Sequence, residues 1–382
     1  MQKLPFKCFT ECKELKGKYV FLRASLNVPI VDGEVHNQFR ITRGLATIQH
    51  LVNQGARVII AGHIQMGKTV PSTEPLLSLF EQHVPVVFST EVIGKKTTEL
   101  RNNLKNGEVL LLENLRSDER EKKNDVTFAQ ELAELADVYV NDAFPASHRE
   151  HASLSAITQF LPSYAGFNFV HEYKELTKTL KPEVPALFLL GGAKFGTKMP
   201  LVEKFLDVYD NVFIGGALAN DFFKAKGFEV GISLVSDISL EGSPLITNSK
   251  ILLPIDVVVE KEGVSRVTSP EDVREGEKIM DAGPATVIML DGYITNAKMV
   301  LWNGPLGDYE RGYEEQTIAT AKLIADAPGY SVIGGGDTVV AIESLNCQEK
   351  YNFLSTAGGA MLTFLELGTL PAIEALKNAP NA

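Results

Sequence analysis

Several strand-like segments in the second half of this 382-residue sequence are followed directly by glycine. The clearest case is 330–345, where the apolar run 331–333 is followed by three glycines and then by Asp337 at the start of a helical pattern. Glycine lets the backbone approach a ligand closely, and the free N–H groups at a helix start suit phosphate. Asp337 could cap the helix or hold a Mg²⁺ that bridges phosphates. This stretch therefore predicts either a tight strand-to-helix turn or a phosphate-binding loop.

Apolar strand-like runs alternate with amphipathic helical segments along the whole chain. Strands are expected at 19–23, 58–61, 86–88, 109–112, 138–140, 186–190, 212–214, 254–259, 299–302, 331–333 and 352–354, and first-half helices at 40–54, 76–82 and 126–136. This alternation is typical of α/β domains with parallel sheets, in which ligands bind beyond the carboxyl ends of the strands.

The length of the chain is too great for a single hydrophobic core. We expect an α/β protein of two Rossmann-like lobes, each a parallel sheet flanked by helices, joined by an interdomain helix and hinge. The expected boundaries are an N-terminal domain at 1–169, a charged interdomain helix at 170–184 and a C-terminal domain at 185–369. Pro182 and Pro185 are expected to end the interdomain helix.

Composition excludes several classes of protein. The net charge of −11 argues against nucleic acid or an anionic membrane as the main partner. No apolar run approaches the roughly 20 residues of a membrane span, and the first residues lack the pattern of a signal peptide. Cys8, Cys12 and Cys347 fit neither a disulfide framework nor a common zinc pattern, as is typical of free thiols in a reducing compartment. We therefore expect a cytoplasmic protein.

Basic and polar residues follow the predicted strands of the first half. They are Asn27, His63, Arg116 and, within 141–151, His148, Arg149 and His151, while Arg40 opens the first helix. Any one arginine could simply pair with a surface carboxylate. Their coincidence at strand ends instead predicts a bowl of Arg and His for a small anion.

Glycine-rich segments follow the predicted strands of the second half, and a flat surface lined by backbone suits a nucleotide. The spacing matches neither a P-loop nor a dinucleotide fingerprint. Lys194 and Lys198 could bind phosphate or be solvated helix residues, and Glu310 could bind a ribose or lie at the surface. An anion bowl in one half and a nucleotide face in the other predict a kinase that closes two domains around two substrates.

A series of motifs carries a resemblance to a known family. In order they are FLRASLNVP, NQFRI, LLENLRSDE, YVNDAFPASHREHAS, LLGGAKFGTK, VFIGGALANDFFKAKG, ILLPIDVVV, LWNGPLGDYE, IGGGDTVVAIE and LSTAGGAMLTFLE. Over essentially its whole length the chain resembles the phosphoglycerate kinase family. The resemblance implies reversible phosphoryl transfer between 1,3-bisphosphoglycerate and ADP, giving 3-phosphoglycerate and ATP with Mg²⁺. It also implies a monomer whose segment 370–382 packs back on the first domain.

The resemblance also implies roles for individual residues. Phosphoglycerate contacts are expected from Ser25, Asn27, Arg40, His63, Arg116 and Arg149, and nucleotide contacts from Gly192, Ala193, Lys194, Lys198, Gly216, Asn303, Pro305, Glu310, Gly334, Gly335, Gly336, Asp337 and Thr338. Arg40, Lys194 and Gly336 are the expected catalytic residues, and Asp337 is the expected Mg²⁺ ligand.

The departures from the family pattern fall in the anion bowl. Ser25 stands where the family usually has an acidic residue, and Gln65-Met66 replaces a Gly-Arg pair, so one phosphate-facing arginine is missing. Lys68 could compensate. A lost charge-assisted hydrogen bond is worth about 1.5–3 kcal/mol, so we expect a working kinase with a raised KM for phosphoglycerate. The alternatives are a non-catalytic nucleotide-binding protein on the same fold and a kinase for another small acid.

Overall fold

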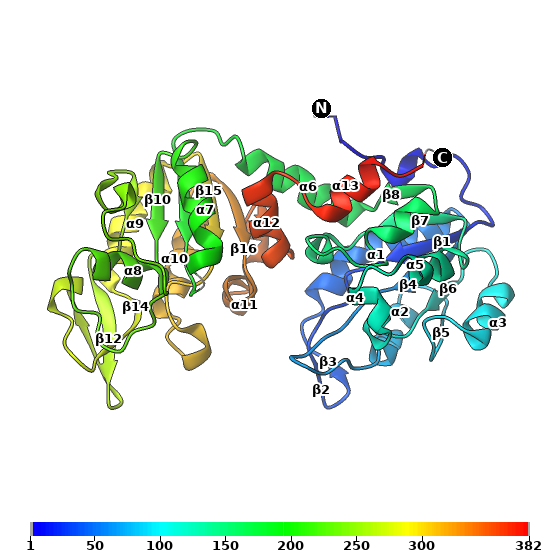
Figure 1. Cartoon of the computed structure of the whole chain (residues 1–382), viewed down its shortest axis with the longest axis horizontal. Coiled ribbons are helices and arrows are strands. Elements are labelled where there is room, and N and C mark those ends of the chain that lie inside the picture. The colour runs from blue at the N-terminus through cyan, green and yellow to red at the C-terminus, as the bar shows by residue number, and fades with distance from the viewer. Residues whose placement is uncertain (1–2, 194, 381–382) are drawn as a thin grey trace. The chain divides into compact units, whose positions relative to one another are not determined.

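The computed structural model describes residues 3–193 and 195–380. The chain divides into two compact units. Unit 1 holds the residues up to 174 together with those from 369 onward, and unit 2 holds residues 175–368. Both units are α/β structures built on a parallel sheet (Figure 1).

Unit 1 is built on a six-stranded parallel sheet. The strand order is β5 (Val86–Phe88), β6 (Val109–Leu111), β4 (Arg57–Ala61), β1 (Tyr19–Arg23), β7 (Val138–Asn141) and β8 (Ser163–Ala165). Its helices are α1 (Phe39–Asn53), α2 (Leu77–Glu81), α3 (Lys95–Asn103), α4 (Glu119–Lys122), α5 (Val126–Ala133), the first part of α6 (Phe167–Thr179) and α13 (Pro371–Lys377). Two short strands, β2 (Ile30–Val31) and β3 (Glu34–Val35), pair in a small hairpin. The strands follow the predicted apolar runs closely.

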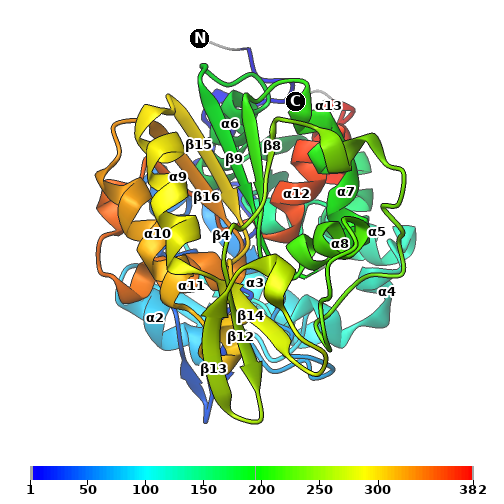
Figure 2. The same ribbon diagram turned by 90° about the vertical axis from the view of Figure 1, so that its left-hand side faces the viewer.

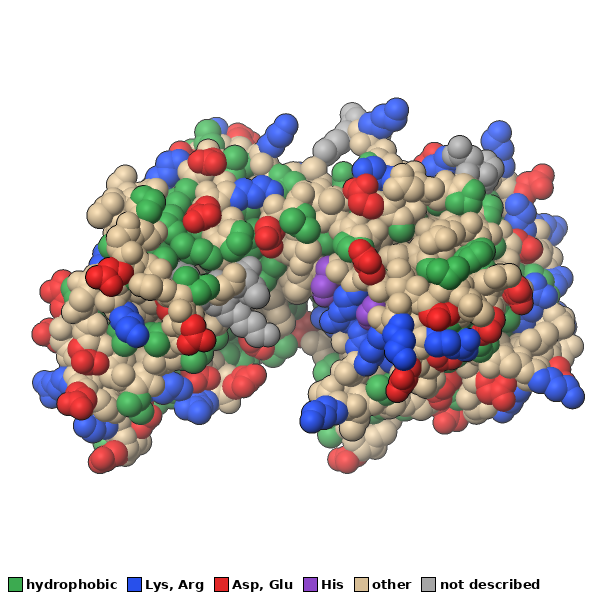
Figure 3. Space-filling view, in the orientation of Figure 1, with side chains coloured by type: hydrophobic (Ala, Val, Ile, Leu, Met, Phe, Trp, Pro, Cys, Tyr) green, Lys and Arg blue, Asp and Glu red, His purple; other side chains and the backbone are tan. Residues whose placement is uncertain are grey.

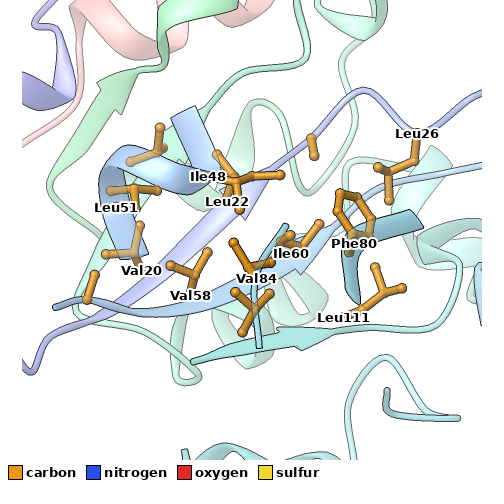
Figure 4. Packing of buried hydrophobic residues seen from close by; sticks show 14 of the residues in the cluster. Val20, Leu22, Leu26, Ile48, Leu51, Val58, Ile60, Phe80, Val84 and Leu111 are labelled. Carbon is orange, nitrogen blue, oxygen red and sulfur yellow. The ribbon is translucent and has the colours of Figure 1, made fainter. Parts of the chain in front are cut away.

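The core of unit 1 forms where α1 packs on the sheet. Val20 and Leu22 are two residues apart on β1, so their side chains lie on the same face of the sheet. They pack with Ile48 and Leu51 of α1 (Figure 4). Each of these four side chains is at most 1% exposed. Burial of an aliphatic side chain of this size contributes about 1.5–3 kcal/mol. This packing fixes the sheet and therefore the loops that leave its carboxyl edge.

Unit 2 repeats the plan with a second six-stranded parallel sheet. The strand order is β11 (Ile251–Leu252), β10 (Asn211–Ile214), β9 (Ala186–Leu190), β15 (Met299–Asn303), β16 (Tyr330–Gly334) and β17 (Phe353–Leu354). Helices α9 (Pro284–Asn296) and α10 (Glu315–Asp326) cover one face, and α7 (Phe195–Leu206) and α12 (Gly359–Leu367) cover the other (Figure 2). The remaining helices are α8 (Leu218–Ala225) and α11 (Gly336–Ser344). The predicted fold class is confirmed for both units.

The strand expected at 254–259 differs from the prediction. It begins at Val257 as β12 (Val257–Lys261) and pairs antiparallel with β13 (Val264–Thr268) and β14 (Lys278–Ala282) in a separate sheet. Val257 and Val259 are buried whereas the alternate residues are partly exposed, a pattern typical of a sheet with one covered face. The apolar run alone did not distinguish this arrangement from a parallel strand.

Helix α6 also differs in extent from the predicted interdomain helix. It begins at Phe167 and ends at Thr179, before both prolines, and the boundary between the units falls inside it, after Lys174. At its start, Oδ1 of Asp142 accepts a hydrogen bond from the backbone N–H of Phe169 at 3.0 Å. The chain returns to unit 1 in α13, where Ala372 lies in a small apolar cluster with Ala143, Ala146 and Leu154. The roles predicted for the two domains stay a prediction.

No single helix among the described residues is long and apolar enough to cross a membrane, although α12 and α13 pass that test of length and composition when taken together as a bent pair.

Candidate active site

Polar side chains at the carboxyl edge of the unit 1 sheet are joined by hydrogen bonds. Asn27 lies beyond β1 and Arg40 lies in the first turn of α1. Nη1 of Arg40 donates to the backbone oxygen of Asn27 at 2.7 Å. The backbone N–H of Gln65, in the loop after β4, donates to Oδ1 of Asn27 at 2.9 Å. Asn27 thus connects the loop after β1 with both the first helix and the loop after β4.

A buried arginine at the end of β1 contacts the polar residues of this edge. Arg23, the last residue of β1, is 0% exposed. Its Nη2 lies 2.8 Å from Nδ1 of His63, and its Nε donates to Oγ of Ser153 at 2.8 Å. Ser153 in turn donates to Oε1 of Glu121 at 2.6 Å, so a buried carboxylate stabilises the buried cation through the hydroxyl. The sequence prediction missed Arg23, although an arginine that ends an otherwise apolar strand is a signal that could have indicated it.

The cationic character of the edge comes from its arginines. Burial first, and then the charge of Arg149, lower the pKa of Arg116 to about 10, so this guanidinium stays charged at neutral pH. Burial and nearby arginines hold the pKa of His63 well below its ordinary value and lower that of His148 to about 4 and that of His151 to about 3. All three imidazoles are therefore neutral near pH 7, and Nδ1 of His63 accepts the hydrogen bond from Arg23.

Most of the predicted phosphoglycerate contacts lie together. Asn27 and Arg40 are hydrogen bonded, and Arg149 is close enough for its charge to lower the pKa values of both Arg116 and His63. Ser25 is half-buried two residues beyond β1. The surface of unit 1 has a group of Lys and Arg side chains with His side chains beside it (Figure 3). This cationic edge offers fixed donors to a small anion.

Unit 2 holds a cavity of about 320 Å³ beyond the carboxyl ends of its parallel strands. Its lining includes six of the predicted nucleotide contacts: Gly192, Ala193, Gly216, Pro305, Glu310 and Asp337. Gly216 has φ +59°, and a Cβ there would lie 2.6 Å from the backbone nitrogen of Gly192. Only glycine lets the loops after β9 and β10 approach this closely, so backbone rather than side chains forms this wall.

Other predicted nucleotide residues lie behind the cavity wall. Lys198 is buried on α7, and its Nζ donates to the backbone oxygen of Gly191 at 2.5 Å. Oγ1 of Thr338 accepts from the N–H of Gly304 at 3.1 Å, which ties the loop after β15 to α11. Asn303 and Gly334 are buried at the ends of β15 and β16. Lys194 lies outside the described residues.

The first turn of α11 carries the predicted phosphate loop. Gly335 precedes the helix with φ +105°, and a Cβ on Gly336 would meet nothing within 4 Å, so this backbone is open to a ligand. Asp337 is exposed and borders the cavity. A helix start with free N–H groups and one carboxylate beside it fits phosphates carrying Mg²⁺, which usually takes one or two carboxylates and otherwise phosphate and water.

An apolar part of the cavity lining was not predicted from the sequence. It includes Phe223, Leu234 and Ile279, whose apolar side chains suit the faces of a base. Asp281 of β14 also lines it, and burial raises the pKa of this carboxyl to about 7. A Cβ on Gly307 would lie 2.5 Å from Cγ of Asp281, so the loop after β15 rests directly on this residue. The apolar run before Asp281 was the available signal for β14.

The fold and these two sites define a two-unit α/β protein with a cluster of fixed cations in one unit and a backbone-lined, nucleotide-sized cavity in the other. A sequence model of the phosphoglycerate kinase family matches residues 10–367. The phosphoglycerate kinases of Methylobacterium radiotolerans and Syntrophobacter fumaroxidans are 40% and 38% identical, covering 97% and 95% of this chain and 98% and 97% of their own lengths.

Solved structures give the same result. The phosphoglycerate kinase of Coxiella burnetii is 33% identical with a TM-score of 0.82, and that of Pyrococcus horikoshii OT3 is 30% identical with a TM-score of 0.84. Both matches cover 97% of this chain, and 99% and 98% of those chains respectively. The chain belongs to the phosphoglycerate kinase family, and membership makes it a kinase. The family and function that the motifs implied are therefore confirmed.

Proposed function

We propose that the protein transfers a phosphoryl group reversibly between the carboxyl group of 3-phosphoglycerate and ADP, forming and consuming 1,3-bisphosphoglycerate and ATP in glycolysis and gluconeogenesis. One observation carries the proposal: a fixed cationic edge in unit 1 and a backbone-lined cavity in unit 2 offer separate sites for a small acid and a nucleotide. Membership of the family supplies the reaction, and the two sites suit its two substrates.

Unit 1 is proposed to bind the phosphoglycerate. Arg116 and Arg149 would neutralise its phosphate, while Asn27 and His63 would bond its oxygens, with Ser25 beside them. Arg40, held by the backbone oxygen of Asn27, is proposed to lie beside the transferring group. Asn27 and Arg40 are hydrogen bonded to each other, His63 is held by Arg23 and Arg116 by Gln65, which lowers the cost of ordering these groups on binding.

Unit 2 is proposed to bind the nucleotide. The apolar wall would hold the base and Glu310 the ribose, since both line the cavity. The N-terminus of α11 would hold the phosphates, and Lys198 would join it by exchanging its hydrogen bond to the oxygen of Gly191 for one to a phosphate oxygen. Asp337 would hold Mg²⁺ together with those phosphates, and the ion would neutralise charge on the phosphate oxygens. Gly336, whose surroundings are open, would let the transferring group approach the backbone.

The proposed chemistry needs no covalent intermediate on the protein. Phosphoryl transfer is accelerated mainly by positioning and by neutralising charge on the transferring oxygens. Arg40 and Lys194 are the side chains proposed for that neutralisation.

We further propose that the protein is a cytoplasmic monomer. Light scattering after size-exclusion chromatography tests the oligomeric state.

A coupled assay and a calorimetric titration with 3-phosphoglycerate, with and without Mg-nucleotide, test the function. Turnover with 3-phosphoglycerate and MgATP supports it. Nucleotide binding without turnover at saturating acid would instead identify a non-catalytic nucleotide-binding protein, and turnover only with a different acid would identify another acid kinase.

A further inference from the structure

Gln65 contacts two of the groups proposed to bind phosphoglycerate, although the sequence indicated only that it replaces a family glycine. Its side-chain Oε1 accepts a hydrogen bond from Nη1 of Arg116. Its side-chain Nε2 donates to the backbone oxygen of Gly67 at 2.9 Å, and its backbone N–H donates to Oδ1 of Asn27. One residue therefore connects Asn27, the loop after β4 and Arg116.

The orientation of the Gln65 amide follows from the chemistry of its partners. A backbone carbonyl can only accept and a guanidinium can only donate, so Nε2 must face Gly67 and Oε1 must face Arg116. The reverse orientation would place two donors together and two acceptors together. The amide oxygen is thus held toward the guanidinium.

The loop that carries Gln65 is itself fixed at both ends. The backbone groups of Met66 and Thr69 exchange two hydrogen bonds of 3.0 Å, which close a tight turn. Nδ2 of Asn114 donates at 2.7 Å to the backbone oxygens of both Ile64 and Pro71. Oδ1 of the same Asn114 accepts from the backbone N–H of Arg116 at 3.0 Å, so the loop and Arg116 share one support.

Arg116 retains donors for a ligand after this contact is made. Its Nε is buried and has no hydrogen-bond partner among residues 3–193 and 195–380. This atom is covered by protein, so the donors that can face a ligand are those of the two terminal nitrogens, Nη1 and Nη2. The contact with Gln65 engages one N–H of Nη1, so this half-buried guanidinium keeps the donors of Nη2 for a ligand.

We propose that Gln65 is a positioning residue for the acid substrate, which orients the guanidinium of Arg116 so that its remaining donors face the substrate phosphate. The inference rests on the proposed function, because it takes 3-phosphoglycerate as the ligand of unit 1. It explains how this chain keeps an ordered anion site where Met66 replaces an arginine: a neutral amide fixes the remaining cation.

Steady-state kinetics with Gln65→Met test the proposal, because methionine keeps the volume and removes both side-chain hydrogen bonds. We expect the KM for 3-phosphoglycerate to rise about tenfold, while kcat and the KM for ATP stay within about twofold. Met66→Leu, an exposed neighbour in the same turn, is the matched control and should leave all three unchanged. A KM that stays the same or falls would overturn the proposal, since a fall would mean that Gln65 competes with the substrate.

A double-mutant cycle separates positioning from a merely structural role. Arg116→Lys replaces the planar guanidinium, whose orientation Gln65 is proposed to fix, with an ammonium group. In that background Gln65→Met should therefore change the KM for 3-phosphoglycerate by less than about twofold. An undiminished tenfold effect in that background would mean that Gln65 does not act through Arg116. Thermal melting and the KM for ATP check that each variant is folded.

Gln65→Glu is a second variant with a different expected signature. A carboxylate cannot donate to the oxygen of Gly67, and it would form an ion pair with Arg116 that competes with the substrate phosphate. We expect a larger rise in KM than with methionine, and one that shrinks as salt is added. A KM equal to that of the wild type would contradict the proposed contact.

Calorimetric titration with 3-phosphoglycerate and with inorganic phosphate requires no turnover. A wild type that binds these anions without turnover would reject the proposed function, while the comparison with Gln65→Met would still decide the role of Gln65. Affinity for both anions that is equal in the wild type and the variant would reject the role of Gln65 while leaving the proposed function intact.

Discussion

Nη2 of Arg23 lies 2.8 Å from Nδ1 of His63 in the buried part of unit 1. A guanidinium has only donors, so Nδ1 accepts and the ring proton is on Nε2. Burial, followed by the charge of Arg23, holds the pKa of His63 well below its ordinary value. His63 is therefore a neutral imidazole whose Nε2–H remains as a donor.

We therefore expect substrate affinity to be insensitive to His63 titration near neutral pH. The KM for 3-phosphoglycerate of the wild type and of His63→Gln, measured between about pH 6 and pH 8, should give parallel curves separated by a constant factor of about five to twenty. Titration of the substrate phosphate affects the wild type and the variant equally, so it does not change the ratio of their KM values. Curves that diverge below about pH 6.5 would mean that His63 gains a proton in this range.

Replacing Arg40 should impair turnover far more than nucleotide binding. Arg40 lies in unit 1, held by the backbone oxygen of Asn27, whereas the nucleotide cavity lies in unit 2. We expect Arg40→Ala to lower kcat by about a hundredfold or more, because a cation beside the transferring oxygens would be lost. Affinity for MgADP, measured by calorimetry, should change by less than about twofold.

Arg43→Ala is the control for that experiment, because Arg43 lies on the same helix and stacks over the ring of Phe39. It should retain nearly the full kcat. If Arg40→Ala and Arg43→Ala were equally active, Arg40 would have no part in the transfer.

The parallel sheets were predictable because the pattern that defines them is local. A short apolar run between helical segments identifies each buried strand, and the residue that follows it must lie at the ligand edge. For this reason Asn27, His63 and Arg116 could be assigned to one site from sequence. The glycine-rich wall in unit 2 was predictable on the same grounds.

The remaining features depend on contacts between distant residues. Arg23 and Ser153 are 130 positions apart, and nothing near either residue in the sequence indicates their hydrogen bond. Gln65 appeared in the sequence only as the replacement of a family glycine, because its contact with Arg116 spans 51 positions. The apolar wall of the cavity brings together Phe223 of α8, Leu234 and Ile279 of β14, which are distant in the sequence, and β14 contains only a short apolar segment.

Asp337→Asn should raise the Mg²⁺ requirement of the reaction. This carboxylate borders the cavity at the first turn of α11, and an amide is a poorer ligand for a hard cation. We expect the Mg²⁺ concentration for half-maximal activity at fixed ATP to increase about tenfold. Asp326→Asn, which breaks only an exposed ion pair with Lys350, should leave it unchanged. Identical Mg²⁺ curves for the wild type and Asp337→Asn would remove Asp337 from its proposed role.

The buried carboxyl of Asp142, at the start of α6, should make unit 1 less stable as the pH rises toward neutrality. Burial raises the pKa of Asp142 to about 7, opposed by the hydrogen bond from the N–H of Phe169. Because this pKa lies above the unfolded value of about 4, the folded state binds the extra proton. The resulting stability is complete below about pH 4 and is lost as the pH rises through about 7.

Asp142→Asn keeps an oxygen for the N–H of Phe169 but has no charge to bury. Between about pH 5 and pH 8 we expect wild-type unit 1 to lose on the order of 1–3 kcal/mol that the variant does not lose. Hydrogen exchange of the α6 amides measures this loss, while fluorescence of Trp302, buried in β15 and the single tryptophan of the chain, follows unit 2 independently. Glu99→Gln, which breaks an exposed pair with Lys95, is the control. Equal pH dependence of α6 exchange in the wild type and Asp142→Asn would mean that another group carries the effect.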